Sequence, residues 1–216
     1  RAGKYFRPQL LYASGLIAGI DAKKLTTIAY ALELTHTYSL IHDDLPAMDN
    51  DDIRRNQPSC HKAFNEATAI LVGDCLQSIA FQSIATAENL KAQEKLVAIQ
   101  ELALAIGANG MVGGQYLDLQ QPDSGQELIF QLKTGALFHA CLVTPVKLQD
   151  NCSTNKLQRL KQCAYHLGLA YQWQDDSIDN SCSHSADKAI LEYEKSKSAI
   201  SELSNSANLQ KCIDIM

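Results

Sequence analysis

Apolar residues recur at steps of three and four along most of this chain, and this spacing constrains the fold more than any other feature of the sequence. It is the period of an amphipathic helix, whereas the two-residue alternation typical of a strand is nearly absent. Only five prolines interrupt 216 residues, so the helices can be long. The sequence therefore predicts an all-α protein, and 46% hydrophobic residues at this length suffice for the core of a single domain over residues 1–216.

Polar segments and glycines separate the predicted helices. Asp21 is a candidate N-cap for a helix that reaches Asp43 and Asp44, and residues 50–59 are expected to form a loop. Pro8 can open an earlier helix. Later helices are expected over residues 63–87, 91–108, 111–119, 126–146 and 155–179, followed by one or two peripheral helices over residues 187–216.

Charge and cysteine usage exclude several classes of protein. A net charge of -5 argues against nucleic acid as a partner, because phosphate backbones select a basic surface. The seven cysteines are scattered and lack the paired spacings of a zinc site or a disulfide framework, so free thiols in a reducing compartment are expected. No run approaches the ~20 consecutive apolar residues of a membrane span, and residues 1–8 do not resemble a signal peptide. We expect a cytoplasmic protein without a membrane span.

Two groups of acidic residues stand at the ends of strongly apolar helices. The first contains five carboxylates within ten positions: Asp43, Asp44, Asp49, Asp51 and Asp52. The second contains Asp175, Asp176 and Asp179, on one predicted helix with Gln172. Carboxylate oxygens are the ligands that magnesium prefers, and magnesium often bridges one or two of them to a phosphate. Each group alone could be a solvated loop or helix end, but together they predict a metal and diphosphate site between helices.

Several cations could hold the anionic substrate of such a site. Arg54 and Arg55 follow the first acidic group directly, and guanidinium forks match diphosphate oxygens well. Lys4 and Arg7 lie near the amino end of the first predicted helix, and Lys133 lies within an otherwise apolar helical run. Surface salt bridging is the alternative for each of them. His36 precedes Asp43 by seven residues, close to two helical turns, so both side chains can face one cavity.

These residues resemble the trans-type polyprenyl diphosphate synthases. The run from Ser39 to Arg55 is similar to the first aspartate-rich motif of the bacterial farnesyl diphosphate synthases in that family. Further matches follow in the family's order: Gly3-Lys4 with Arg7-Pro8, Gly73-Asp74, Gly113-Gly114-Gln115, Lys133-Thr134-Gly135-Ala136, and Gln172 to Asp179. The resemblance implies the isoprenoid synthase fold, a bundle of long helices around a central cavity. It also implies a transferase that joins isopentenyl diphosphate to dimethylallyl or geranyl diphosphate by ionisation, condensation and elimination.

The resemblance implies a role for each matched position. Three magnesium ions, or manganese in their place, would be held by Asp43, Asp44, Asp49, Asp175 and Asp179. The allylic diphosphate would be bound by Arg54, Lys133, Thr134 and Gln172. Isopentenyl diphosphate would be bound by Gly3, Lys4, Arg7, His36 and Arg55. Lys133, Asp43, Asp44 and Asp175 would be the catalytic residues, and family members pair as homodimers.

Product length is expected to depend on the apolar space beneath the first acidic group. Tyr38 lies five residues before Asp43, where an aromatic ring could close the floor of the channel, and Ser39 is small. Within the family, this combination of residues resembles that of enzymes whose product stops at fifteen carbons. The resemblance therefore implies farnesyl diphosphate as the product. Geranylgeranyl or geranyl diphosphate is the alternative product.

The chain also departs from the family pattern. Tyr5 replaces an arginine, Ser177 replaces an aliphatic residue, and a lysine- and glycine-rich segment expected after Asp179 is absent. The region after Asp118 is shortened, and the family's amino-terminal helices are not in the sequence. Three other functions stay open: a terpene cyclase, an HD-type metal phosphohydrolase built on His36 and His42-Asp43, and a noncatalytic partner subunit.

Overall fold

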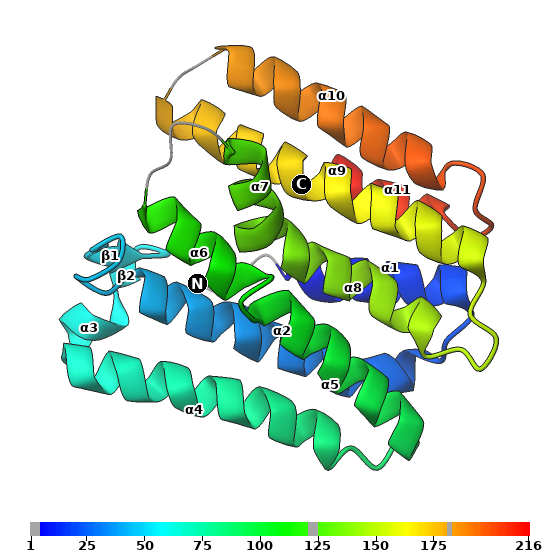
Figure 1. Ribbon diagram of the computed structural model, residues 1–216, viewed down its shortest axis with the longest axis horizontal. Coiled ribbons are helices and arrows are strands. Elements are labelled where there is room, and N and C mark those ends of the chain that lie inside the picture. Colours follow the sequence, from blue (N-terminus) through cyan, green and yellow to red (C-terminus); the bar gives the residue numbers. More distant parts are fainter. Residues whose placement is uncertain (1–4, 121–124, 181–182) are drawn as a thin grey trace.

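Long helices lying side by side form almost the whole structure (Figure 1). The computed structural model describes residues 5–120, 125–180 and 183–216, and the side chains of residues 179–184 lie outside this description. In chain order the elements are α1 (Phe6–Ala18), α2 (Ala22–Asp43), β1 (Ile53–Arg54), β2 (Gln57–Pro58), α3 (Cys60–Ala63), α4 (Glu66–Ala85), α5 (Ala92–Ile106), α6 (Met111–Leu119), α7 (Gln126–Phe130), the π-helical turn η1 (Gln131–Gly135), α8 (Ala136–Lys147), α9 (Thr154–Asn180), α10 (Ser183–Ile200) and α11 (Ala207–Asp214). The all-α prediction is confirmed.

Local capping explains where the first long helices begin and end. Asp21 is the N-cap of α2, as predicted, and its side chain accepts a hydrogen bond from the Lys23 backbone N–H at 2.9 Å. Gly19 ends α1 with a left-handed backbone at φ 72°, a conformation that costs glycine little. Asn65 caps α4 by accepting from the Thr68 N–H at 2.7 Å. These caps fix the starts of α2 and α4, which then pack against each other along their lengths.

Helix α8 lies at the centre of the bundle and packs against α1, α5 and α9. Residues around its whole circumference are buried: Leu137, Phe138, Ala140, Cys141, Leu142, Val143, Thr144, Pro145 and Val146. A helix that is apolar on every side needs partners on every side. The main core cluster accordingly draws residues from α1, α2, α4, α5, α8, α9, α10 and α11.

The structure corrects the predicted elements in two places. The single helix expected over residues 126–146 is divided into α7, the π-helical turn η1 and α8. The loop expected over residues 50–59 contains a short antiparallel hairpin in which Ile53 pairs with Pro58 and Arg54 with Gln57. Strands of two residues are too short to show an alternating pattern. The two residues between them, Arg55 and Asn56, have φ of 54° and 61°, as tight hairpin turns require.

Three helical stretches are long and apolar enough to cross a membrane by length and composition alone: Glu66–Ala85, Ala92–Leu119 and Gln126–Lys147. The third stretch includes α8, which is buried within the protein core. The first is only 22% buried and the second 33% buried, so α4, α5 and α6 present much apolar surface. Such a surface is equally suited to contact with another protein, and the stretches are not evidence of a membrane span.

Candidate active site

The two predicted acidic groups lie at the same end of the bundle. Asp43 is the last residue of α2, Asp175 lies near the end of α9, and both helices end on the side where the β1–β2 hairpin projects (Figure 1). The chain turns sharply after α2, and the Asp49 backbone N–H donates to the Asp43 carbonyl oxygen at 2.9 Å. This turn brings Asp49 back beside Asp43, so the first group gathers around the end of one helix.

Asp43 occupies an environment that favours its neutral form. Burial raises the pKa of Asp43 to about 6; the charges of Lys133 and Arg54 oppose this shift, and that of Asp49 adds to it. The Gln115 side-chain amide donates to Asp43 Oδ1 at 2.5 Å. A cation placed beside a carboxyl group in this environment strongly stabilises its ionised form.

The negative charge of Asp44 is compensated by Arg54 of the β1–β2 hairpin. Its exposed fraction is 2%, and Arg54 donates to its Oδ1 both through Nη2 and, at 2.9 Å, through Nε. Arg54 Nη2 also lies 3.0 Å from Asp51 Oδ2. The hydrogen bond to Asp44 is the main cause that raises the pKa of Arg54. An arginine and an aspartate predicted to bind opposite parts of a metal–diphosphate complex are therefore paired with each other here.

The π-helical turn η1 connects the first acidic group to α9. Lys133 Nζ lies 2.6 Å from Asp118 Oδ2 and 4.0 Å from Asp49 Oδ2. The next residue, Thr134, donates its hydroxyl to Gln172 Oε1 at 2.9 Å, one helical turn before Asp175. π-helical turns are rare and occur frequently at functional sites. Through two adjacent side chains, this turn reaches both the loop after α2 and the second acidic motif.

Close backbone contacts at two glycines hold η1 in place. A Cβ atom on Gly114 of α6 would lie 2.2 Å from the Lys133 backbone nitrogen. A Cβ atom on Gly168 of α9 would lie 2.6 Å from the Gly135 Cα atom. Such distances are impossible for an alanine without movement of the backbone. Gly114 of the Gly113-Gly114-Gln115 motif and Gly168 of α9 therefore let these two helices approach the turn that carries Lys133.

The described residues predicted to bind isopentenyl diphosphate come from α1, α2 and the turn of the hairpin. Arg7 packs over the Phe138 ring, with its Cζ atom 5.0 Å from the ring centroid. Burial, followed by the charges of Arg7 and Arg55, lowers the pKa of His36 to about 2, so this imidazole is neutral at physiological pH. Gly3 and Lys4 lie outside the described residues. The structure thus gathers Arg7, His36 and Arg55 in one electrostatically coupled group.

A cavity of about 270 Å³ adjoins this group. It lies between α2, the hairpin and α3, and three of the predicted site residues, Asp44, Arg54 and Arg55, contribute to its lining. The remaining lining residues are Thr37, Leu40, Ile41, Pro58, Ser59, Cys60, Ala63 and Phe64. The cavity is thus apolar on one side and carries two guanidinium groups on the other.

Tyr38 and His42 face α4. The Tyr38 side chain is 5% exposed and meets the His42 ring edge-on, with the centroids 5.8 Å apart. His42 Nε2 lies 3.0 Å from the Ile70 carbonyl oxygen of α4. Ser39 donates its hydroxyl to the His36 carbonyl one turn earlier. His42 is thus engaged in packing between helices, which argues against the HD-type phosphohydrolase.

The second acidic motif is described in part. Asp175 acts electrostatically on Arg7, Tyr171 and Tyr193, and Gln126 Nε2 donates to Asp176 Oδ2 at 3.4 Å. Asp179 belongs to α9, but its side chain lies outside the description. Within residues 5–120, 125–180 and 183–216, no three acidic, histidine or cysteine side chains are close enough to hold a metal ion. The described carboxylates of the two motifs lie at one end of the fold.

Sequence reasoning missed three residues of this region. The sequence pattern places Gln115 only in a glycine motif, although its side-chain amide donates a hydrogen bond to Asp43. Asp118, the partner of Lys133, follows that motif by three residues on the same helix, and this spacing was the available signal. Glu33 lies three residues before His36, so helical spacing could have placed it on the same face of α2.

Comparisons with known proteins agree with this arrangement. Residues 1–206 match the polyprenyl synthetase family. The chain is 48% identical over 187 residues to farnesyl diphosphate synthase of Haemophilus influenzae and 44% identical over 184 residues to that of Escherichia coli, covering 82% of this chain in both cases. It spans 62% of the length of these two relatives. A geranyltransferase structure from Legionella pneumophila superposes with a TM-score of 0.92 at 38% identity, over 99% of this chain and 82% of that one. The isoprenoid synthase fold is confirmed.

Replacing Asp43 with asparagine is expected to stabilise the metal-free protein at high pH. Because the folded-state pKa is raised from 3.8 to about 6, ionising Asp43 costs folding free energy as pH rises between those values. The Asp43→Asn variant should therefore unfold at the same urea concentration as wild type near pH 4. It should gain roughly 1 to 2 kcal/mol above pH 7, allowing for solvent screening. A variant less stable than wild type at pH 8, in the presence of EDTA, would contradict this reading of the site.

Proposed function

The chain belongs to the polyprenyl synthetase family, and on this basis we propose that it condenses isopentenyl diphosphate with dimethylallyl or geranyl diphosphate to form farnesyl diphosphate. The observation that carries the proposal is the bridge made by η1. Lys133 reaches the carboxylates beside α2 and α6, while Thr134 reaches Gln172 on α9. A diphosphate placed against this turn would meet donors from several helices at once.

Magnesium is proposed as the cofactor, held by Asp43, Asp44, Asp49, Asp175 and Asp179. The donor set fits, because all five offer carboxylate oxygens and the buried Asp43 favours neutralisation by a nearby positive charge. When bound, magnesium would supply positive charge to the leaving diphosphate. Three ions, with manganese as a substitute, are what the family resemblance implies for a metal–diphosphate complex of this kind.

The residues of the chain would divide the work between the two substrates. Lys133, Thr134, Arg54 and Gln172 would bind the allylic diphosphate and stabilise its charge as the carbon–oxygen bond breaks. On the other side, Arg7, His36 and Arg55, with Gly3 and Lys4, would hold isopentenyl diphosphate. Its double bond forms the new carbon–carbon bond, and the proton then lost passes to the released pyrophosphate. This route requires no side-chain nucleophile.

Product length would be limited by residues on the lower part of α2. Below Tyr38, the interior between α2, α4, α5 and α8 is filled by Ile28, Ala31, Leu32, Ile84, Ala98, Leu102, Ala140 and Thr144. Tyr38 lies between this packed region and the carboxyl end of α2. Its ring and the neighbouring Ser39 would form the floor of the channel. Farnesyl diphosphate is the proposed product, and geranylgeranyl or geranyl diphosphate the alternative.

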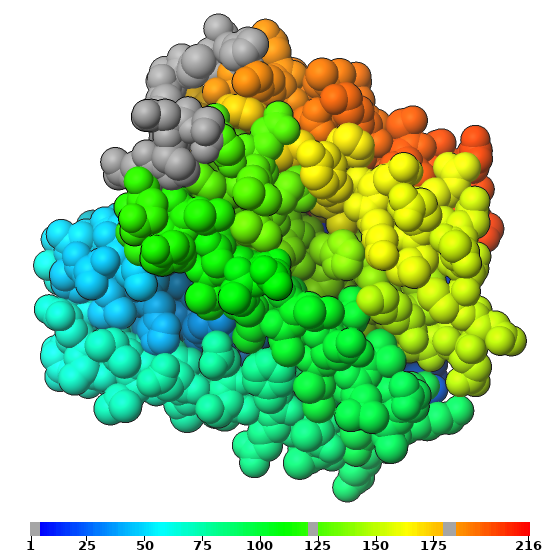
Figure 2. Space-filling model, viewed as in Figure 1, coloured from blue at the N-terminus to red at the C-terminus, as the bar shows by residue number. Residues whose placement is uncertain are grey.

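We further propose that the chain forms a homodimer through α4, α5 and α6. Large apolar side chains on these adjacent helices are exposed: Ile70, Leu71, Leu96, Leu104, Val112, Tyr116 and Leu119. Among the exposed residues of α4, only Glu66 and Asp74 carry charge. Figure 2 shows α4 and α5 together along one side of the molecule. A large, nearly uncharged surface on a protein with net charge -5 suits a second copy of the same chain.

One domain over residues 1–216 and a cytoplasmic location complete the proposal. The main core cluster joins residues of the first helix, α1, to residues of the last, α11, which supports one folding unit. The six cysteines within the described residues are free thiols, as expected for a reducing compartment.

Incubation with isopentenyl and geranyl diphosphates tests the activity directly. We expect farnesyl diphosphate in the presence of magnesium and none after EDTA is added. Lys133→Met should lower kcat by about 10²-fold or more, because a donor to the leaving group is lost. Lys211→Met removes a lysine from α11 and serves as the control with unchanged kcat. Product formed equally well without divalent cations would refute the proposed mechanism.

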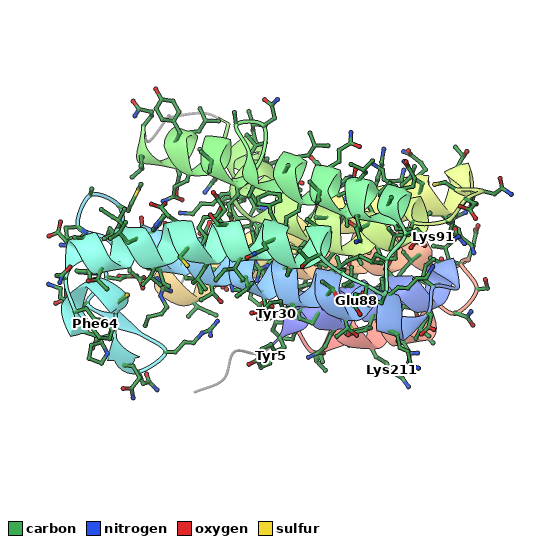
Figure 3. All side chains as sticks on the ribbon, turned by 90° about the horizontal axis from the view of Figure 1, so that it is seen from below. Tyr5, Tyr30, Phe64, Glu88, Lys91 and Lys211 are labelled. Carbon is green, nitrogen blue, oxygen red and sulfur yellow. The ribbon has the colours of Figure 1, made fainter. Side chains whose placement is uncertain are left out.

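Replacing Tyr38 with alanine should lengthen the product by one isoprene unit. The substitution frees the space of one aromatic ring, while the packed residues below still close the channel. Tyr30 lies on the same helix but is 53% exposed (Figure 3), so Tyr30→Ala is the matched control. Product analysis by mass spectrometry should show geranylgeranyl diphosphate only for Tyr38→Ala. An unchanged product from that variant would show that Tyr38 does not form the floor of the channel.

Placing a charge on the apolar surface should prevent dimer formation. Leu71 of α4 is 66% exposed, and Leu71→Glu would bury a carboxylate in the proposed interface. Analytical ultracentrifugation should show a dimer for wild type and a monomer for this variant. Ile215→Glu, at a residue 63% exposed near the carboxyl end, should remain dimeric. A dimeric Leu71→Glu protein would show that the dimer interface lies elsewhere.

A further inference from the structure

Two glutamines of α9 lie just before Asp175, and each is hydrogen-bonded to a different element. Gln172 Oε1 accepts a hydrogen bond from the Thr134 hydroxyl of η1 at 2.9 Å. Gln174 Oε1 accepts one from the Tyr193 hydroxyl of α10 at 2.7 Å. Successive residues of a helix are about 100° apart around its axis, so the two glutamines leave α9 on nearly opposite sides. The direction of Asp175 falls between them.

Trp173 holds the remaining side of α9. It lies two residues before Asp175, which places it about 160° away around the helix axis. Trp173 is 7% exposed and meets the Phe130 ring of α7 edge-on, with the centroids 5.1 Å apart. From α10, Lys188 Nζ lies 4.0 Å from the centroid of the Trp173 ring, as in a cation–π contact. The rotation of α9 about its own axis is therefore fixed from three sides at the residues that precede Asp175.

Tyr193 is itself held in place on α10. This helix packs side by side with α9 (Figure 1). The neighbouring Glu192 is 8% exposed, and its carboxylate lies 2.7 Å from His166 Nδ1 of α9 and 2.6 Å from Lys195 Nζ. Burial raises the pKa of Tyr193, so its hydroxyl keeps the proton that it donates. The hydroxyl is thus a hydrogen-bond donor whose position is set by the packing of two helices.

We propose that Tyr193 is a positioning residue for the metal–diphosphate site, because its hydroxyl holds Gln174 and thereby fixes the rotation of α9 that places Asp175. The inference rests on the proposed function, in which Asp175 binds magnesium. Groups that orient a metal ligand contribute to metal affinity even when they do not contact the metal. Without the hydroxyl, Gln174 can adopt other rotamers, and this end of α9 is held from two sides instead of three.

Tyr193→Phe removes the hydroxyl and keeps the ring, which packs against the main core. Isothermal titration calorimetry at a fixed magnesium concentration should give a Kd for inorganic pyrophosphate about two- to tenfold higher than that of wild type, because one hydrogen bond is lost. In the active enzyme, the magnesium concentration that gives half the maximal rate should rise by a similar factor, while KM for isopentenyl diphosphate stays constant. A hydroxyl that serves only packing would lower the melting temperature and leave these constants unchanged.

Tyr12→Phe is the matched control. The Tyr12 hydroxyl of α1 donates to Thr26 Oγ1 of α2 at 3.2 Å, so this substitution also removes a tyrosine hydrogen bond between two helices. Thr26 lies near the start of α2, whereas Asp43 is its last residue. Tyr12→Phe should therefore bind pyrophosphate and magnesium as wild type does.

A second variant tests whether Tyr193 acts through Gln174. Gln174→Met has a side chain of similar length that cannot accept the hydrogen bond, and it should weaken pyrophosphate binding as much as Tyr193→Phe does. The double variant should bind no more weakly than either single variant, because both substitutions remove the same interaction.

The inference is overturned if Tyr193→Phe binds pyrophosphate as tightly as wild type, if Tyr12→Phe loses as much affinity, or if the two losses add in the double variant. Its failure is distinguishable from failure of the proposed function, since the binding measurements require no turnover. Weaker binding by Tyr193→Phe, in a protein whose wild type transfers no prenyl group, would refute the function alone. Prenyl transfer by wild type together with equal binding would refute the role of Tyr193 alone.

Discussion

The arrangement of this protein depends on compensating charge that is concentrated at one end of an apolar bundle. Five aspartates lie within ten residues of one another, and four are held near cations of the same chain. Arg54 contacts Asp44 and Asp51, Lys62 contacts Asp52, and Lys133 lies between Asp118 and Asp49. Carboxylates and cations alternate at this end, and the pairing of Asp44 with Arg54 matters most because Asp44 alone among these paired carboxylates is buried, whereas the others remain exposed to water.

That alternation requires helices to approach more closely than side chains normally allow. Gly114 and Gly168 bring α6 and α9 against the backbone of η1. Gly73 similarly leaves room for the His42 ring between α2 and α4, since a Cβ atom there would lie 1.9 Å from His42 Nε2. Gly73 and Gly114 belong to motifs of the family pattern, and Gly168 lies one helical turn before Gln172, so each of these glycines stands in or beside a segment singled out for function. Packing and chemistry are therefore specified by the same short segments of sequence.

The sequence was sufficient to predict the helices and most of the residues that gather at the site. Asp21 as a cap, Asp43 at the end of its helix, and Lys133 near the acidic loop were all visible in spacing or in motifs. The π-helical turn was not, because residues 126–146 keep a helical apolar pattern through η1. The pairing of Asp44 with Arg54 was also hidden, since it depends on a hairpin whose strands have two residues each. Glu33 was missed because a single acid beside apolar residues resembles an ordinary partly solvated helix position.

The pairs seen in the structure imply that cations and anions bind to this end of the fold cooperatively. A diphosphate that takes Arg54 from Asp44 leaves a carboxylate that is 2% exposed without its partner. An unpaired buried charge is costly, so a divalent cation then binds more favourably beside Asp44. The reverse also holds: a cation on Asp44 releases Arg54 for an anion, and thermodynamic linkage requires the two effects to be equal. On the proposed function, the metal ions and the allylic diphosphate would therefore enter as one complex, because either alone would break ion pairs that only both together can replace.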